Sequence, residues 1–105
     1  MARYIVRVEL HDTGDRSKAY DALHHEMGKH AFKQTITESR ITYNLPSAEY
    51  AYHHAGEIRI EEVLRKAKAA ADSTGKKYAI LVSEIKDCMF DGLEKTSKAL
   101  RDLRP

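Results

Sequence analysis

Residues suited to acid-base chemistry stand at the end of the first predicted strand, where Glu9, His11 and Asp12 follow one another closely. An imidazole beside a carboxylate can take up and return a proton, for example from a ribose 2′-hydroxyl. Guanidinium groups can stabilise the charge that develops on a phosphate. The arginines available for that role are Arg3, Arg7, Arg40 and Arg59. The alternative is structural, because His11 and Asp12 also suit a turn that ends a strand.

Two tyrosines form a second group of interest. Tyr50 and Tyr52 alternate after Pro46, which cannot donate to a sheet ladder. If this segment is extended, both rings lie on one side of an edge where a second chain can add by strand pairing. Packing of the two rings within the monomer is the alternative.

Histidines are frequent enough to raise the question of a metal site. The candidates are His24, His25, His30, His53 and His54. Neighbouring histidines on a helix point about 100° apart, and in a strand they point to opposite faces. No HxxxH or HExxH pair occurs. We therefore predict neither a metal site nor a bound cofactor.

Composition limits the class of protein. The chain has 105 residues and a net charge of +2, without the concentrated positive charge of a duplex-binding protein. Cys88 is the only cysteine, so it has no partner for an intramolecular disulfide or a cysteine zinc site, which favours a reducing compartment. The apolar run at the N-terminus is short and interrupted by Arg3 and Arg7, unlike a signal peptide or a membrane span. A cytoplasmic protein is expected, and nothing favours DNA as a partner.

The elements that must position these residues follow from periodicity. Alternation predicts strands over residues 3–10 and 77–84 and a hairpin over residues 32–45. A first helix has Asp15 or Ser17 as its N-cap and ends near residues 28–30. A second helix runs from residue 58 or 60 to residue 74, and residues 47–54 form an edge strand, a bulge or a loop. The expected apolar face of the second helix comprises Ile60, Val63, Leu64, Ala67 and Ala71.

This order of elements predicts a ferredoxin-like α+β fold, βαββαβ, over residues 1–85. Right-handed crossovers place both helices on one face of an antiparallel sheet. The open face then displays mostly polar side chains of three predicted strands: Arg3, Ile5, Arg7, Glu9, Lys33, Thr35, Thr37, Thr42 and Asn44. Tyr4, Tyr43 and Tyr78 fall in the apolar phase, which is unlike an RNA-recognition motif, whose exposed sheet face carries the stacking aromatics.

The C-terminal extension, residues 86–105, carries apolar residues at helical spacing. They are Leu93, Leu100 and Leu103, with Ser97 on the same face. The spacing is typical of a short amphipathic helix appended to the core, and a loosely held tail is the alternative.

Three stretches carry a family resemblance: MARYIVRVEL, TYNLPSAEYAY and AKAAADSTGKKYAILVSE. Together they resemble the GhoS-type family, the endoribonuclease antitoxins of type V toxin-antitoxin systems, over about residues 2–84. The resemblance implies a ferredoxin-like fold, an RNA substrate and an antitoxin that cuts the messenger RNA of its toxin. The shared motifs are structural, so the resemblance supplies no catalytic residues.

The leading hypothesis is an RNA-directed regulator and sequence-selective endoribonuclease that acts without metal on single-stranded RNA and forms a homodimer. The candidate catalytic residues are His11, Asp12, Arg3 and Arg7, and the candidate RNA or partner surface comprises Arg40, Tyr50, Tyr52 and Arg59. The rival hypothesis is a non-catalytic module that dimerises through its open sheet face or through the edge from Tyr50 to Tyr52.

Overall fold

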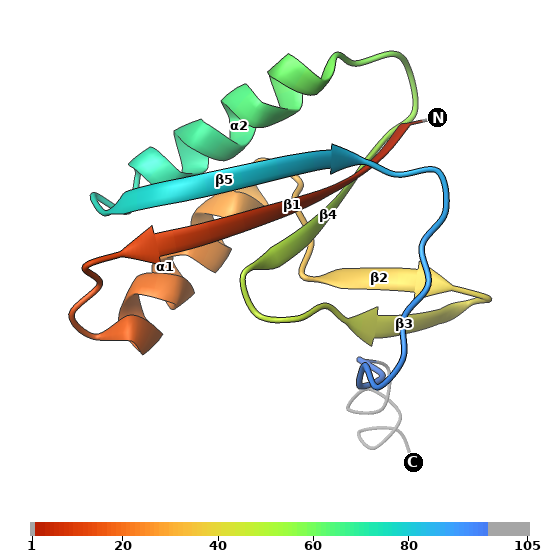
Figure 1. The fold of residues 1–105 in the computed structure, drawn as a ribbon, viewed down its shortest axis with the longest axis horizontal. Helices are drawn as coiled ribbons and strands as arrows, with labels where there is room; N and C mark the ends of the chain where they lie inside the picture. The colour runs from red at the N-terminus through yellow and green to blue at the C-terminus, as the bar shows by residue number, and fades with distance from the viewer. Residues whose placement is uncertain (1, 97–105) are drawn as a thin grey trace.

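The structure is a computed structural model that describes residues 2–96. Alternating apolar and polar residues form the strand β1, Ala2–His11, which is the central strand of its sheet (Figure 1). Its inward side chains are buried: Tyr4, Val6, Val8 and Leu10. Antiparallel pairing joins β1 to β4, Glu49–His54, on one side and to β5, Lys77–Glu84, on the other. The segment after Pro46 that we expected as an edge strand, a bulge or a loop is therefore a strand.

The first helix, α1, covers Arg16–Lys29 and begins where the sequence predicts. Asp15 is its N-cap, and its carboxylate accepts a hydrogen bond from the backbone N–H of Lys18. The side chains of Ala19, Tyr20, Leu23 and Met27 are buried against the sheet.

The second helix, α2, covers Ile60–Asp72 and packs beside α1 on the same face of the sheet (Figure 1). Its buried stripe consists of Val63, Ala67, Ala70 and Ala71. The expectation that Ile60 and Leu64 belong to this stripe is wrong, since they are 40% and 38% exposed. Alanine faces the sheet because small side chains let the helix backbone approach it closely, which turns the larger residues outward.

The hairpin departs from the predicted sheet. β2, Thr35–Glu38, pairs with β3, Ile41–Asn44, as a separate two-stranded sheet. A single bridge, Lys33 to Ala51, joins the segment before β2 to the outer side of β4. The ferredoxin-like order is thus not confirmed, and the fold is a small α+β fold with mostly antiparallel strands. β2 buries only Ile36, so the hairpin offers little apolar surface with which to extend the sheet over the helices.

The chain after β5 crosses to the hairpin (Figure 1). The backbone N–H of Asn44 donates to Glu94 and that of Thr96 donates to Thr42, so the chain forms one antiparallel bridge, Tyr43 to Lys95, beside β3. The ring of Phe90 packs edge-on against that of Tyr43, with 4.7 Å between centroids. Residues 86–96 contain no helix, and the rest of the predicted C-terminal helix lies outside the described residues.

Candidate functional site

The predicted acid-base group lies at the far end of β1 from Arg3. His11 is the last residue of the strand and pairs with Lys77, and Asp12 follows in a left-handed turn with φ 52°. Eight positions separate Arg3 from His11, which is about 26 Å at roughly 3.3 Å per strand residue. Arg7 is about 13 Å from His11 by the same measure. The structure therefore does not bring the four candidate catalytic residues together.

The other candidate arginines occupy separate surfaces. Arg7 lies 3.8 Å from Glu49, and Arg59 lies 3.2 Å from Glu61 at the start of α2. Arg40 is exposed at the tip of the β2–β3 hairpin, in a left-handed conformation with φ 67°. Surface ion pairs of this kind contribute at most about 1 kcal/mol each to stability.

Tyr50 and Tyr52 are core residues, 0% and 3% exposed. The hydroxyl of Tyr50 lies 2.6 Å from Nδ1 of His24, and the hydroxyl of Tyr52 accepts a hydrogen bond from Nζ of Lys66 at 3.1 Å. Of the two roles expected for these rings, the structure shows packing within the monomer. This packing leaves neither ring on a surface that a partner can reach.

A groove of about 590 Å³ lies between β4 and the hairpin. It forms because the chain pairs with β4 only at Lys33 and then turns away as β2. The groove is lined by Ala31, Lys33, Thr35, Thr37, Thr42, Ala51 and His53. The hydroxyls of Thr37 and Thr42 lie 2.8 Å apart across the hairpin, so they form a hydrogen bond. The walls of the groove thus present hydroxyl, ammonium and imidazole groups.

Arg3 adds a second cation beside this groove. It stands opposite His53 in the β1–β4 register, and its Nη2 donates to Oε1 of Glu38 at 3.0 Å, which ties β1 to β2. Partial desolvation lowers the pKa of His53, and the positive charges of Arg3 and Lys33 lower it further, while Glu38 opposes the shift. The imidazole is consequently neutral near pH 7 and able to accept a proton.

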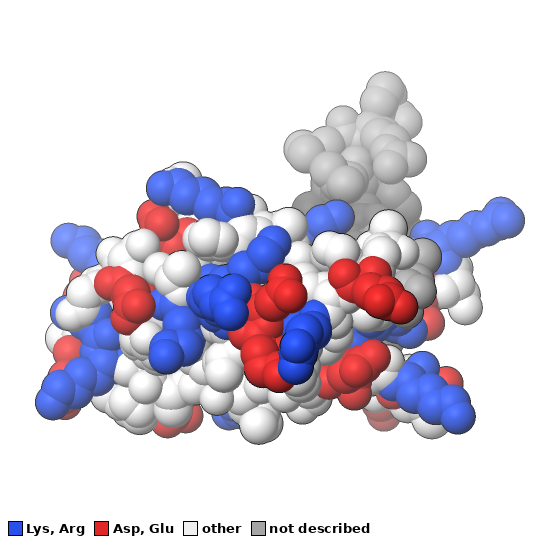
Figure 2. All heavy atoms as spheres, turned by 90° about the horizontal axis from the view of Figure 1, so that it is seen from above, with Lys and Arg blue, Asp and Glu red and all other residues white. Residues whose placement is uncertain are grey.

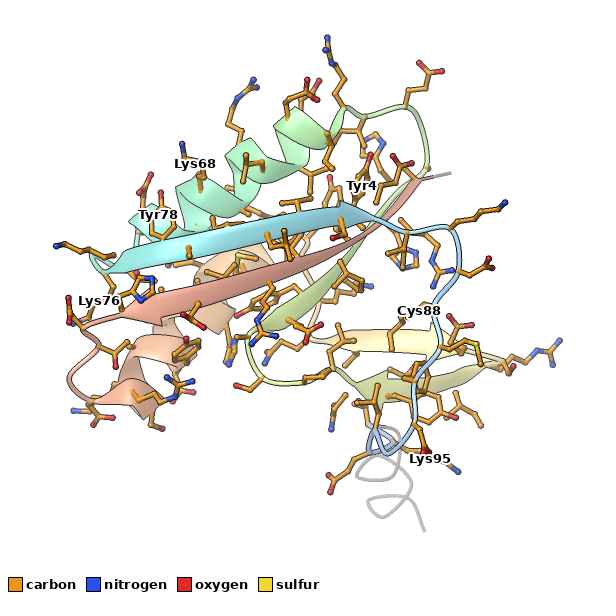
Figure 3. The ribbon with its side chains drawn as sticks, viewed as in Figure 1. Tyr4, Lys68, Lys76, Tyr78, Cys88 and Lys95 are labelled. Carbon is orange, nitrogen blue, oxygen red and sulfur yellow. The ribbon has the colours of Figure 1, made fainter. Side chains whose placement is uncertain are left out.

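The groove differs in charge from the face over α2. Seen from above α2, basic and acidic side chains are interspersed, with no broad region of one sign (Figure 2). Lys68 lies on that helix, away from the hairpin (Figure 3). The groove instead combines the Lys33 ammonium with hydroxyl groups, and the Arg3–Glu38 ion pair lies beside it. This arrangement suits an anionic, hydroxyl-bearing ligand such as a phosphate ester.

Sequence reasoning found part of this groove. Lys33, Thr35, Thr37 and Thr42 were expected on the open sheet face, and all of them line the groove. His53 was considered only as a metal ligand. Its position opposite Arg3 depends on the β1–β4 register, which no local pattern specifies.

The structure adds two findings on other kinds of site. Among residues 2–96, no group of three His, Cys, Asp or Glu side chains is placed to hold a metal ion. None of the described helices combines the length and the apolar character needed to cross a membrane.

Comparison with known proteins gives no further lead. Protein-family models, curated proteins and solved structures were searched, and none of them matches this chain. The fold and the site define a small α+β protein with a polar groove between β4 and the hairpin.

Proposed function

We propose that this protein is a cytosolic RNA-directed regulator that binds single-stranded RNA in the groove between β4 and the hairpin. The observation that carries the proposal is a groove lined by Lys33, His53 and threonine hydroxyls, with Arg3 beside it, opposite His53. The two cations would neutralise backbone phosphate, which supplies much of the affinity in nucleic-acid binding. The hydroxyls can bond to ribose and base edges.

The same side chains support metal-independent cleavage. Neutral His53 would take the proton from a ribose 2′-hydroxyl, whose oxygen attacks the adjacent phosphorus. The bond from phosphorus to the 5′ oxygen breaks, and that oxygen takes a proton from water. The products are a 2′,3′-cyclic phosphate and a 5′-hydroxyl end. Arg3 and Lys33 would stabilise the negative charge that grows on the phosphate oxygens.

The antitoxin role and the ferredoxin-like relationship belong to this proposal. Two features support the relationship: both helices lie on one face of the sheet, and Lys33 bridges to β4 at the place where a fourth strand would pair. On this view the chain leaves the sheet after one residue pair and continues as the hairpin. The resemblance to GhoS-type antitoxins then suggests a toxin messenger RNA as the substrate.

End-labelled single-stranded RNA, incubated with the protein and EDTA, tests the proposal. We expect discrete cuts with the wild type, loss of cutting in His53→Gln and weaker RNA binding in Lys33→Ala. Lys68→Ala removes the same charge from α2 and should leave both unchanged. His11→Ala and Asp12→Ala should cut normally, because these residues lie far from the groove. Intact RNA and no RNA binding with the wild type would reject the proposal.

A second candidate function is a dimeric interaction module without catalysis, and one observation favours it. Leu81 on β5 is 64% exposed on the open sheet face, where it pairs with Arg7 and lies near Glu9. Two copies related by a two-fold axis could bury Leu81 and pair Arg7 of each copy with Glu9 of the other. Sedimentation equilibrium should then show a dimer that Leu81→Lys converts to a monomer, whereas the surface variant Leu64→Lys on α2 stays dimeric.

A further inference from the structure

The guanidinium of Arg3 is only half satisfied. Its Nη2 donates to Glu38, but its Nε is buried and has no hydrogen-bond partner among residues 2–96. These two nitrogens lie on the same edge of the guanidinium, the edge that binds carboxylates and phosphates through two parallel hydrogen bonds. Glu38 engages only one of the two. The edge therefore keeps an unused donor.

Among residues 2–96, Glu38 is the only anion that acts on the pKa of His53. The negative charge of Glu38 raises the pKa of His53, whereas Arg3 and Lys33 lower it. The side chains of Arg3 and Glu38 are 26% and 37% exposed, so the ion pair is partly open to solvent, whereas Nε is buried and is reached only when its neighbours move aside. An incoming anion and the Glu38 carboxylate would compete for the same guanidinium.

We propose that Glu38 is an internal competitor for the groove and that a bound phosphate group takes the Arg3 guanidinium from it. This inference rests on the proposed function and names how ligand entry is controlled. A phosphate group offers two oxygens to Nε and Nη2, in place of the single Glu38 contact. Exchange also frees β2 from its ion pair with β1, so the hairpin can adjust around the ligand.

Removing the Glu38 charge should therefore tighten binding. Exposed ion pairs contribute about 0.2 to 1 kcal/mol, so Glu38→Gln should bind about 1.4- to fivefold more tightly. Glu62→Gln, on α2, changes the net charge of the protein equally and should bind as the wild type does. Arg3→Lys keeps the charge but loses the two-donor edge, so it should bind more weakly, with or without Glu38→Gln.

The probes are inorganic phosphate and a single-stranded RNA 12-mer, titrated by NMR chemical shift with circular dichroism as the check of folding. Tighter phosphate binding in Glu38→Gln and not in Glu62→Gln is the expected result. Equal or weaker binding in folded Glu38→Gln, or no phosphate binding by any variant, would overturn the inference. If Glu38→Gln binds phosphate more tightly but no variant binds RNA, the competition between Glu38 and phosphate for Arg3 stands and the RNA function fails. If RNA binds the wild type and Glu38→Gln equally, the RNA function stands and the competition fails.

Discussion

Nδ1 of His24 on α1 lies 2.6 Å from the hydroxyl oxygen of Tyr50 on β4. The Tyr50 ring is fully buried, and burial raises the pKa of its hydroxyl, which therefore keeps its proton. The hydroxyl donates to Nδ1 in the neutral tautomer that carries its proton on Nε2. The contact joins the first helix to an outer strand of the three-stranded sheet. It makes the stability of the fold depend on a titratable group.

Stability should fall in mild acid because of this contact. Burial lowers the pKa of His24 below its ordinary value of 6.5, with Asp21 opposing the shift. As pH falls through 6.5, the unfolded chain therefore binds more protons than the folded chain. The free energy of unfolding is highest above that pH and declines below it. Urea unfolding between pH 5 and 8 measures the trend. His24→Asn keeps an acceptor near Nδ1 and cannot ionise, so its profile should be flatter, and an unchanged slope would contradict the assignment.

Residues that favour positive φ should stabilise the turn of the β2–β3 hairpin. Ser39 and Arg40 both have positive φ, 51° and 67°, between the paired residues Glu38 and Ile41. Two such residues make a type I′ turn, which favours Asn-Gly. Replacing Ser39 with Asn and Arg40 with Gly should raise the free energy of unfolding by about 0.5 to 1 kcal/mol, measured by urea titration. A fall in stability would show that the native side chains contribute more than the strain costs.

Phe90 should hold the chain after β5 against the hairpin. Phe90→Ala removes the ring that packs on Tyr43, and loss of an aromatic pair costs about 0.5 to 1.5 kcal/mol. The amide of Asn44, which donates to Glu94, should then exchange with solvent up to about tenfold faster. The control is Met89→Ala, since Met89 is 96% exposed. Hydrogen exchange followed by NMR tests this, and equal rates in both variants would rule out a restraining role for the ring.

The α2–sheet contact should reject larger side chains. Ala70 is fully buried, so Ala70→Leu should lower the free energy of unfolding by about 1 to 3 kcal/mol. The neighbouring Ala69 is exposed, and Ala69→Leu should change stability by less than about 0.5 kcal/mol. Thermal and urea unfolding compare the two. Similar effects at both positions would mean that the helix can rotate to accommodate the leucine.

Local signals in the sequence predicted local structure well. Alternation from Tyr4 to Leu10 defined the central strand, and the cap at Asp15 is a contact within a few residues of chain. The phase of α2 was partly misjudged, because hydrophobicity alone favours Ile60 and Leu64 over alanine. What decides the phase is how closely the helix approaches the sheet, which depends on the whole fold.

The candidate site depends on contacts between distant segments. Arg3 meets His53 only through the β1–β4 register, and Glu38 reaches Arg3 only because the hairpin leaves the sheet. Tyr50 alternates as an edge residue would, yet its side chain is covered by α1. No short stretch of sequence encodes these relations, so the groove emerged only from the structure.

The central place of β1 has a consequence for synthesis. This strand leaves the ribosome before the other described strands, but its partner β5 is the last of them, and their pairing closes a loop of most of the described residues. The nascent chain must therefore wait until Glu84 has emerged before its sheet can be completed. During that interval one edge of β1 has no neighbour and can pair with other chains. Slow translation prolongs the exposure of that edge. Closing a loop of this length also slows the pairing of β1 with β5.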